Sequence, residues 1–576
     1  MTESELSAVL RADGEIAAER LDHWAKTAGN RCFFYYGEEN KALTYAEFGA
    51  RTDRIAGNLA DNGIRKGDHV SVFSTNPLVC ALAMFGIWKA GAVYCPVNFG
   101  YMGRLLAYQL NDTAPRLIIT DRGLLGALIG VANDLQQPPA VCLFDAAGGA
   151  PGAGDSAAPV AIDARFGRRL AWADLEQPAT RPTVSLAFDD PANIIYTSGT
   201  TGPSKGVVQP HRWMAQYTFW GRAFLSTEDV IYNDLPMYHV GGAVFNIVRA
   251  AMVGCEVAVW DRFSPNAFWD RIRSRGATTA VLLDVMIPWL TKAPVSPQDR
   301  HNTLNKAHMQ PLPESHAAVS KRFGFDFVTA GFGQTESGGP LAIFIEQTAQ
   351  GEGTPPEFYK GHSHEEVLRL VRQVGIPIAT AEQASIKRVM GLPSPFFEAT
   401  VLDEHDQTCE SGQVGQLALR PKLPGLIMQE YLGKPDKTVA AWRNLWFHTG
   451  DAAVRHDNGM FAFVDRLGDR IRVRGENLSS FQVEDVFAQH PSVGLATAFA
   501  IPAIEGDEDD IVLFVTPHAG AQLTEQELHD YAAKNMPKYM RPRHIRIVDE
   551  IPRTATNKIE KYKLRAKLLA ELGRTV

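Results

Sequence analysis

The sequence lacks the features typical of membrane-spanning, metal-stapled and nucleic-acid-binding proteins. Its 576 residues include six cysteines, which are scattered and form no C-x-x-C pair. That pattern excludes a zinc knuckle and indicates reduced thiols. No apolar run approaches the ~18 residues that a membrane-spanning helix needs. The net charge of −8 argues against a nucleic-acid-binding surface. We therefore expect no transmembrane segment and no nucleic-acid partner.

The remaining composition is that of an ordinary globular protein. Hydrophobic residues make up 45% of the chain and charged residues 21%, and both values are typical. Residues 1–15 are acidic and amphipathic, unlike a signal peptide, so with the scattered cysteines they predict a cytoplasmic protein. A chain of this length is too long for one core and is expected to contain two or more domains.

Residues 196–207, which read YTSGTTGPSKGV, are the most informative stretch. Glycines and hydroxyls favour turns over helix or strand interiors, and an apolar strand is predicted just before them, at 192–196. A loop that leaves a strand and offers N–H groups, hydroxyls and an ammonium is suited to phosphate oxygens. No hydroxyl follows Lys205, so this is not a Walker A loop, and the dinucleotide fingerprint lacks its third glycine. The alternative interpretation is an exposed, flexible turn.

The surrounding segments predict an α/β fold. A helix is expected over 43–60, opened by a capping box of Thr44 and Glu47. A strand at 69–74 and a helix over 79–90 that ends at Gly91 follow. This order of elements indicates a parallel sheet. We also expect an aromatic helix over 211–225, a strand from Phe327 into a polar turn that ends at Ser337, and C-terminal helices over 481–490 and after Thr524.

Two segments carry no recognisable chemistry. Residues 146–159, rich in Ala, Gly and Pro, predict a surface loop. Residues 347–388 contain an amphipathic helix expected over 365–373, between turns with Pro and Gly. Capping of a pocket and contact with a partner are both open for this segment, and we expect surface decoration.

The phosphate loop resembles that of the adenylate-forming superfamily, which includes acyl-CoA synthetases, firefly luciferase and peptide-synthetase adenylation domains. Further motifs occur in the family's order from about Thr44 to the C-terminus: GAVYCPVN at 91–98, LPMYHVGG at 235–242, FGQTE at 332–336, WFHTGD at 446–451, DRLGDRIRVRGEN at 465–477 and PRTATNKIEKYKLR at 552–565. The resemblance implies an α/β fold with a large, multi-subdomain N-terminal domain at 1–467. A small, mobile α+β domain at 468–576 would carry the catalytic lysine.

The same resemblance implies which residues bind ATP. Asp451 would accept both ribose hydroxyls, since two acceptor oxygens suit a vicinal diol. Glu336 would hold magnesium, which prefers one or two carboxylates plus phosphate oxygens, and Thr335 would contact the α-phosphate. The other ATP-binding residues implied are the loop residues Thr197, Ser198, Gly199, Thr200, Thr201, Gly202 and Lys205, the adenine-side residues Phe332, Gly333 and Gln334, and Arg466 at the ribose or phosphate.

The remaining site residues follow from the resemblance as well. Lys558 corresponds to the family's catalytic lysine, and catalysis is assigned to it with Glu336 and Thr335. The acyl substrate would lie near His239, Val240 and Gly331, and coenzyme A near Arg474, Gly475 and Glu476. Gly468 stands at the hinge, where relatives carry Lys or Asp, and glycine has the φ/ψ freedom that a hinge requires.

The sequence departs from the family pattern at several positions. Phe332 replaces a tyrosine, which keeps the ring and loses the hydroxyl. Residues 306–313 (KAHMQPLP) replace a segment of small residues that contacts adenine and ribose. Asn557 replaces a glycine, and asparagine tolerates the left-handed region better than most residues.

The resemblance implies an ATP-dependent acid–CoA ligase that forms an acyl-adenylate and then a thioester. A stand-alone adenylation enzyme that loads a carrier protein and an inactive adenylate-binding homologue are the alternatives. Three stretches, at 264–278, 423–431 and 534–542, resemble the crotonobetaine/carnitine–CoA ligase branch. The acid could be a betaine, a fatty acid, an aryl acid or another small acid. The implied ligands are a small carboxylic acid, ATP, Mg²⁺ and coenzyme A, and a homo-oligomer is possible.

We expect Lys558→Ala to lower carboxylate-dependent ATP–pyrophosphate exchange by roughly two orders of magnitude or more, the scale of losing one preorganised transition-state donor. Thioester formation from a supplied acyl-adenylate should be spared, because that step does not need the lysine. Both half-reactions are measured on the purified variant. Near-normal exchange would show that this lysine has another role.

Overall fold

The computed structural model describes residues 2–12, 14–145, 164–197, 204–283, 285–466, 470–473, 476–504, 508–552, 559 and 561–574. The chain divides into two compact units. The N-terminal unit comprises Met1–Phe99, Leu110–Ile195 and Gly206–Val464, and the C-terminal unit comprises Gly100–Gln109, Tyr196–Lys205 and Asp465–Val576. The predicted domain boundary at 467–468 and the predicted surface loop at 146–159 lie outside the described residues, and both stay predictions.

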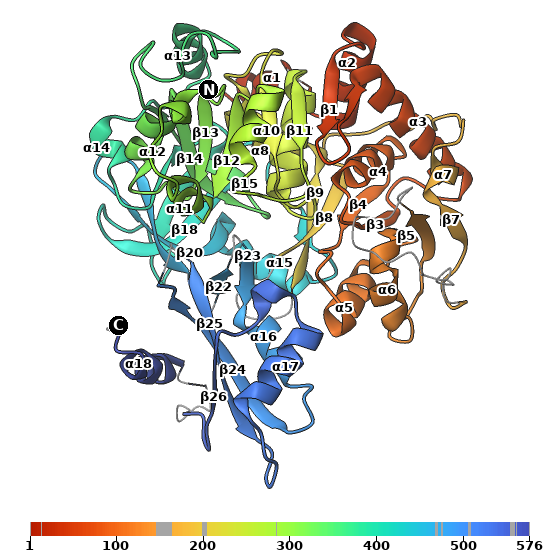
Figure 1. The fold of residues 1–576 in the computed structure, drawn as a ribbon, viewed down its shortest axis with the longest axis vertical. Coiled ribbons are helices and arrows are strands. Elements are labelled where there is room, and N and C mark those ends of the chain that lie inside the picture. The colour runs from red at the N-terminus through yellow and green to blue at the C-terminus, as the bar shows by residue number, and fades with distance from the viewer. Residues whose placement is uncertain are drawn as a thin grey trace. The chain divides into compact units, whose positions relative to one another are not determined.

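Two large sheets form the framework of the N-terminal unit (Figure 1). The first has 13 strands among the described residues, in the order β17 (Phe397–Leu402), β18 (Val414–Pro421), β20 (Phe447–Arg455), β21 (Phe461–Arg466), β16 (Val389–Pro393), β15 (Gly338–Glu346), β14 (Phe327–Gln334), β13 (Lys306–Gln310), β12 (Thr279–Leu283), β10 (Val230–Asn233), β11 (Glu256–Val259), β1 (Cys32–Tyr36) and β2 (Lys41–Thr44). The second has eight, in the order β19 (Glu430–Tyr431), β9 (Lys205–Pro210), β8 (Pro191–Thr197), β4 (Val93–Pro96), β3 (His69–Phe73), β5 (Leu117–Asp121), β6 (Ala140–Phe144) and β7 (Arg169–Ala171).

The central strands of both sheets are parallel, which confirms the predicted α/β fold. In the smaller sheet β3 pairs in parallel with β4 and β5. In the larger sheet β10 pairs in parallel with β11 and β12, and β12, β13 and β14 continue the parallel series. Parallel strands end at a common edge, where ligands of open α/β sheets bind. The polar residues that follow β14 therefore lie at such an edge.

Local capping signals place the helices largely as predicted. Thr44 and Glu47 form the capping box of α3, and α4 ends before Gly91, whose φ is +77°. The aromatic helix α8 ends at Arg222, three residues before the predicted end. The helices of the N-terminal unit include α1 (Glu3–Ala12), α2 (Ala17–Thr27), α3 (Tyr45–Asp61), α4 (Pro77–Lys89), α6 (Leu125–Gly130), α7 (Trp172–Leu175), α8 (His211–Arg222), α9 (Arg249–Val253), α10 (Phe268–Arg275), α11 (Met286–Thr291), α12 (His316–Phe323), α14 (Ala381–Ala384) and α15 (Pro435–Ala441). Most of α5 (Gly103–Thr113) belongs to the C-terminal unit.

The segment at 347–388 is not the surface decoration that the sequence led us to expect, because its helix packs into the core. Its helix α13 (His364–Gln373) begins one residue before the predicted start. Val367 and Val371 are fully buried in the main hydrophobic core of the unit. His364 Nε2 lies 2.7 Å from a carboxylate oxygen of Glu346 on β15. The segment thus contributes to the core.

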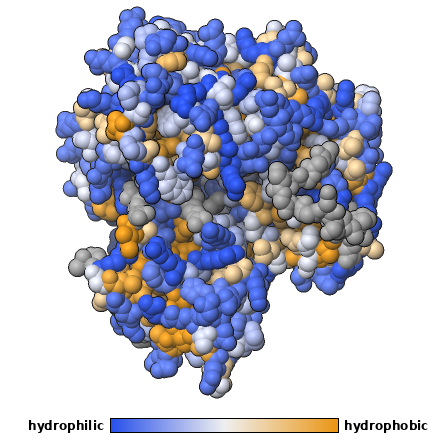
Figure 2. Space-filling view, in the orientation of Figure 1, coloured by the Kyte–Doolittle hydropathy of each residue, from blue (hydrophilic) through white to orange (hydrophobic). Residues whose placement is uncertain are grey.

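One face of the N-terminal unit can be judged for its apolar surface. The face of the N-terminal unit seen in Figure 2 is mostly hydrophilic, with single hydrophobic residues scattered over it. None of the helices in the described part of the chain is long and apolar enough to cross a membrane.

The C-terminal unit is built around a sheet of β24 (Val493–Pro502), β25 (Asp509–Pro517) and β26 (His544–Ile547). Helices α16 (Ser480–Phe487) and α17 (Glu525–Asn535) pack on one face, and α18 (Lys561–Glu571) packs on the other (Figure 1). Alternation along β25 explains this, because Leu513 joins the first cluster while Val512 joins the second. The capping box of Thr524 and Glu527 opens α17, as predicted. A β22–β23 hairpin (Arg470–Val473 and Glu476–Ser479) precedes α16.

A buried ion pair joins two strands of the larger sheet. Lys306 Nζ on β13 lies 2.9 Å from Asp229 Oδ1, just before β10, and both side chains are almost fully buried. Burial raises the pKa of Asp229, but the Lys306 ammonium and hydrogen bonds outweigh it and hold the pKa below its usual value. Removal of one partner would leave an uncompensated charge in the interior.

We therefore expect Lys306→Met to reduce the free energy of unfolding by about 3–5 kcal/mol. Chemical denaturation of the purified variant measures the change. Lys387→Met, which removes a solvent-exposed partner of Glu314, is the matched control and should leave stability nearly unchanged. Equal effects of the two substitutions would contradict this account of the buried pair.

Candidate active site

The polar turn after β14 is held in place by donors from three separate segments. Gln209 Nε2 on β9 donates to the carbonyl of Thr335 (2.7 Å). Trp213 Nε1 on α8 and the backbone N–H of Met428 both donate to the carbonyl of Glu336 (3.3 and 2.8 Å). These bonds satisfy carbonyls that the turn cannot pair with its own backbone. Thr335 and Glu336, predicted together from the sequence, are therefore fixed side by side.

The Glu336 carboxylate is oriented by a tyrosine that the sequence did not reveal. Tyr431 Oη donates to Glu336 Oε1 at 3.0 Å, and the tyrosine is 5% exposed. Tyr431 is positioned because β19 pairs antiparallel with β9, opposite Val207. In the part of the chain that the structure describes, no group of three or more His, Cys, Asp or Glu side chains could hold a metal.

Gln334 and Asp451 also lie together, although 117 residues separate them. Gln334 Nε2 donates to Asp451 Oδ2 (2.5 Å) and to the carbonyl of Thr449 (2.9 Å). The Asp451 backbone N–H donates to Thr449 Oγ1 (3.1 Å), and Asp451 is 2% exposed. This network fixes a carboxylate in a buried position next to the end of β14, where it can accept hydrogen bonds from a ligand.

The adenine-side residues differ in accessibility. Phe332 is 8% exposed and packs in a hydrophobic cluster with Leu341, Met390 and Phe396, whereas Gly333 is exposed. Contact of Phe332 with adenine stays a prediction. In the phosphate loop, Thr197 ends β8 and Lys205 begins β9.

Several predicted site residues are not described by the structure. Ser198, Gly199, Thr200, Thr201, Gly202, Gly468, Arg474, Gly475 and Lys558 lie outside the described residues, as do the side chains of Arg466 and Glu476. Their assigned roles stay predictions.

One face of β13 and β14 carries polar groups with accessible surface. Neighbouring positions on the two strands are His308 and Thr329, whose Nδ1 and Oγ1 atoms lie 3.0 Å apart. Gln310 Nε2 donates to the carbonyl of Gly331 (3.1 Å). These four residues are half-buried, whereas Val328, Ala330 and Met309 between them are buried. We call this surface the His308 face.

The His308 imidazole is neutral. Burial, with a smaller contribution from the Arg249 charge, lowers the pKa of His308 to about 3. A Cβ atom added at Gly331 would come within 2.4 Å of the carbonyl of Leu341, so a glycine is required at this position of β14. A neutral polar surface without a bulky side chain is suited to the body of a small organic ligand.

Aromatic side chains lie opposite the His308 face. The Phe245 ring is 4.9 Å from the His308 ring and 5.4 Å from that of Tyr217, centroid to centroid. Phe245 belongs to a π-helix, η2 (Gly241–Val248), which the sequence did not predict. His239 and Val240, expected at the acyl substrate, directly precede this helix, and His239 is half-buried while Val240 is 8% exposed.

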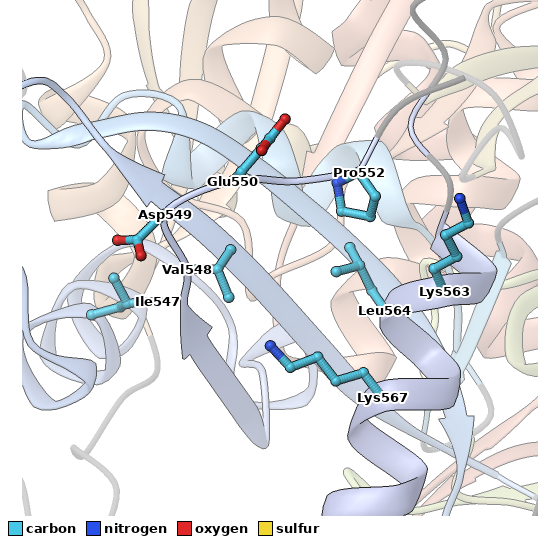
Figure 3. Close-up of a pocket in the computed structure, with 8 residues that line it drawn as sticks. All are labelled: Ile547, Val548, Asp549, Glu550, Pro552, Lys563, Leu564 and Lys567. Atoms are coloured by element: carbon cyan, nitrogen blue, oxygen red, sulfur yellow. The ribbon is translucent and has the colours of Figure 1, made fainter. Parts of the chain in front are cut away.

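A separate pocket of about 470 Å³ lies in the C-terminal unit (Figure 3). It is lined by residues of the segment 547–552 and of α18, and Leu564 and Lys567 lie on the helix side. None of the site residues predicted from the sequence lines it. The candidate active site is the set of groups around the end of β14, where hydrogen bonds bring the predicted residues Gln334, Thr335, Glu336 and Asp451 together.

Two family models match the chain. The model described as "AMP-binding enzyme" matches residues 21–432, and the one described as "AMP-binding enzyme C-terminal domain" matches residues 482–558. Curated relatives include the crotonobetaine/carnitine–CoA ligase of Citrobacter koseri, 26% identical over 96% of this chain and 99% of the relative. That of Salmonella typhi is also 26% identical, over 91% and 93%.

Solved structures of similar fold span almost the whole chain. The o-succinylbenzoate CoA synthetase of Bacillus subtilis has a TM-score of 0.72 at 20% identity and covers 95% of this chain and 98% of its own. The fatty acyl CoA synthetase of Mycobacterium tuberculosis has a TM-score of 0.62 at 21% identity, with coverage of 97% and 99%. These likenesses establish the adenylate-forming fold.

We expect Asp451→Asn to raise the KM for ATP roughly tenfold or more. The substitution replaces one acceptor oxygen with an NH₂ group. Either that NH₂ group faces the Gln334 Nε2 donor, or the ribose loses an acceptor. The KM for the acid should change less. Initial-rate kinetics on the purified variant measure both constants. Asp457→Asn, at an exposed position after β20, is the matched control, and an unchanged KM for ATP in Asp451→Asn would remove Asp451 from the nucleotide site.

Proposed function

Since the chain belongs to the AMP-binding enzyme family, we propose that it joins a carboxylic acid to coenzyme A through an acyl-adenylate. It is a carboxylic acid–CoA ligase, in line with its family and with curated relatives of the same activity that span nearly its full length. ATP and coenzyme A are substrates of this family. The roles of individual residues in the two half-reactions, described and undescribed, are what we propose.

One structural observation supports the proposal most directly. The Thr335–Glu336 turn and the Gln334–Asp451 pair meet at the end of β14, where both carboxylates are held by hydrogen bonds. A buried acceptor for a sugar diol beside a carboxylate oriented for a phosphate-bound cation fits a nucleoside triphosphate. The His308 face on the same strand provides a neutral surface for the acid.

The first half-reaction is attack of a carboxylate oxygen on the α-phosphorus of ATP. The new O–P bond forms as the bond to the β-phosphate oxygen breaks, giving acyl-AMP and pyrophosphate. In the second, the thiol sulfur of coenzyme A attacks the acyl carbonyl carbon. AMP then leaves with the carboxylate oxygen it received, and the thiol proton goes to solvent or a nearby base.

The described residues contribute binding and orientation. Asp451, fixed by Gln334, accepts the ribose hydroxyls, and the Thr335 side chain approaches the α-phosphate. The Glu336 carboxylate, oriented by Tyr431, would hold Mg²⁺, and the cation would offset negative charge on the phosphates.

The proposal assigns the charge-stabilising role to Lys558 and the rotation between half-reactions to a hinge at Gly468. Both assignments rest on the sequence motifs. The Arg474–Glu476 segment would face coenzyme A after the rotation. Such alternation lets one small domain serve two reactions in turn.

Two linked assays test this function against its alternatives. Carboxylate-dependent ATP–pyrophosphate exchange reports adenylation, and thioester formation with free coenzyme A reports the transfer. We expect both with a suitable acid. Exchange without transfer to free coenzyme A would favour a carrier-loading enzyme, and no exchange with any acid would favour an inactive homologue.

Glu336→Gln should raise the Mg²⁺ concentration needed for half-maximal exchange, because it removes the charge that attracts the cation and keeps the side-chain shape. Tyr431→Phe should produce a smaller shift in the same direction, since it removes only the orienting hydroxyl. Magnesium titrations of the exchange rate measure both shifts. Glu430→Gln, at the exposed position next to Tyr431, is the control. A magnesium dependence unchanged by Glu336→Gln would place the metal elsewhere.

A further inference from the structure

Arg249 is a cation in the interior of the N-terminal unit with very few polar partners. Arg249 is the first residue of α9 (Arg249–Val253) and is 2% exposed. Nη2 donates to Asn246 Oδ1 (3.1 Å), and the guanidinium carbon lies 4.4 Å from the centre of the Phe245 ring. Among the described residues, no hydrogen-bond acceptor faces Nε. The guanidinium therefore has donors to spare in a buried setting.

Within the described part of the chain, no carboxylate forms an ion pair with Arg249. Asp229, the carboxylate that acts on it from a distance, is engaged by Lys306 at 2.9 Å. Burial lowers the pKa of Arg249 to about 10, so the side chain remains charged near neutral pH. Buried charges are costly unless they are paired and hydrogen-bonded. An anion from outside the chain would supply both the charge and the missing acceptors.

Arg249 lies along the wall that faces the acid-binding surface. A Cβ atom added at Gly221 on α8 would come within 2.9 Å of Arg249 Nη1, so Gly221 makes room for the guanidinium. Tyr217 is four residues earlier on α8 and hence on the same helix face, one turn away. A Cβ atom at Gly333 would be 3.7 Å from the Tyr217 ring. One helix face thus leads from the end of β14, past Tyr217, to Arg249.

The distance along this wall is short. One turn of α-helix rises about 5.4 Å, so Gly221, which the Arg249 guanidinium approaches, lies about that far along α8 from Tyr217. The Phe245 ring touches both ends of the path, since it packs on Tyr217, His308 and the guanidinium. A short carbon chain along the His308 face would bring its far end to Arg249.

We propose that Arg249 selects acids that carry a second carboxylate at the end remote from the one that is activated, so that the substrate is a short dicarboxylic acid. This inference rests on the proposed function. The planar fork of a guanidinium matches a carboxylate in a bidentate arrangement. The neutral His308 face would contact the carbon chain between the two carboxylates. The same charge disfavours acids with a quaternary ammonium group at that end.

The test is a substrate panel in the ATP–pyrophosphate exchange assay. Succinate, glutarate and adipate are compared with butyrate, pentanoate and hexanoate, and crotonobetaine represents the cationic acids. We expect wild-type protein to give a higher kcat/KM with one of the diacids than with the monoacid of equal chain length. Arg249→Met should lower that diacid's kcat/KM by about 30-fold or more, mainly through KM, as expected when one partner of a buried charge pair is removed. It should leave the matched monoacid unchanged or improved.

Arg222→Met is the matched control, because Arg222 is also buried at the end of α8 and donates to Thr218 Oγ1 and the carbonyl of Ala215 within that helix. It should not change the ratio of diacid to monoacid activity. Arg249→Lys keeps the charge without the fork and should retain part of the diacid preference. If Arg249→Met does not fold, the Arg249→Lys variant and the wild-type substrate panel still test the proposal.

Preference of the wild-type protein for a monoacid or for crotonobetaine would overturn the inference and leave the ligase function intact. Equal losses of kcat/KM with diacid and monoacid in a folded Arg249→Met variant would also overturn it, because that result is expected if Arg249 has only a structural role. No exchange with any of these acids or with longer and aromatic ones would overturn the ligase function, and this inference with it.

Discussion

The site depends on a buried chain of hydrogen bonds that runs from the smaller sheet to the turn after β14. Trp88 Nε1 donates to Asn193 Oδ1, Asn193 Nδ2 donates to Gln209 Oε1, and Gln209 Nε2 donates to the carbonyl of Thr335. Asn193 and Gln209 are fully buried, so each lost bond would leave a buried polar group unsatisfied. The chain ties the turn that carries Glu336 to strands β8 and β9, which flank the phosphate loop.

Near this network of hydrogen bonds, negative, neutral and positive groups of the N-terminal unit occupy different places. Carboxylates gather at the end of β14, where Glu336 and Asp451 are held by a tyrosine and an amide. The His308 face beside them is polar and neutral, because burial keeps the imidazole unprotonated. The positive charge of Arg249 lies beyond that face. In the proposed binding mode, the acid would contact the neutral His308 face along its length and the Arg249 guanidinium at its far end.

Local sequence patterns predicted the fold well and the site only in part. The capping box of Thr44 and the alternation of strands and helices depend on neighbours in the chain, and the structure confirms them. Tyr431 contacts Glu336 across 95 residues, and no local pattern marks such a pair. Arg249 stands in an apolar run, where its burial depends on the π-helix before it and on Gly221 of another helix. The segment at 306–313, which departs from the family pattern, supplies His308 and Gln310 to the His308 face, where we propose that the acid binds.

The formation of an acyl-adenylate is tested most directly by following an oxygen atom. The acid is labelled with ¹⁸O in the carboxylate to be activated and incubated with the wild-type protein, ATP, Mg²⁺ and coenzyme A, and the nucleotide product is analysed by mass spectrometry. Attack of the carboxylate on the α-phosphorus predicts AMP that contains one ¹⁸O atom, formed together with the acyl-CoA. Unlabelled AMP, or ADP in place of AMP, would contradict the account.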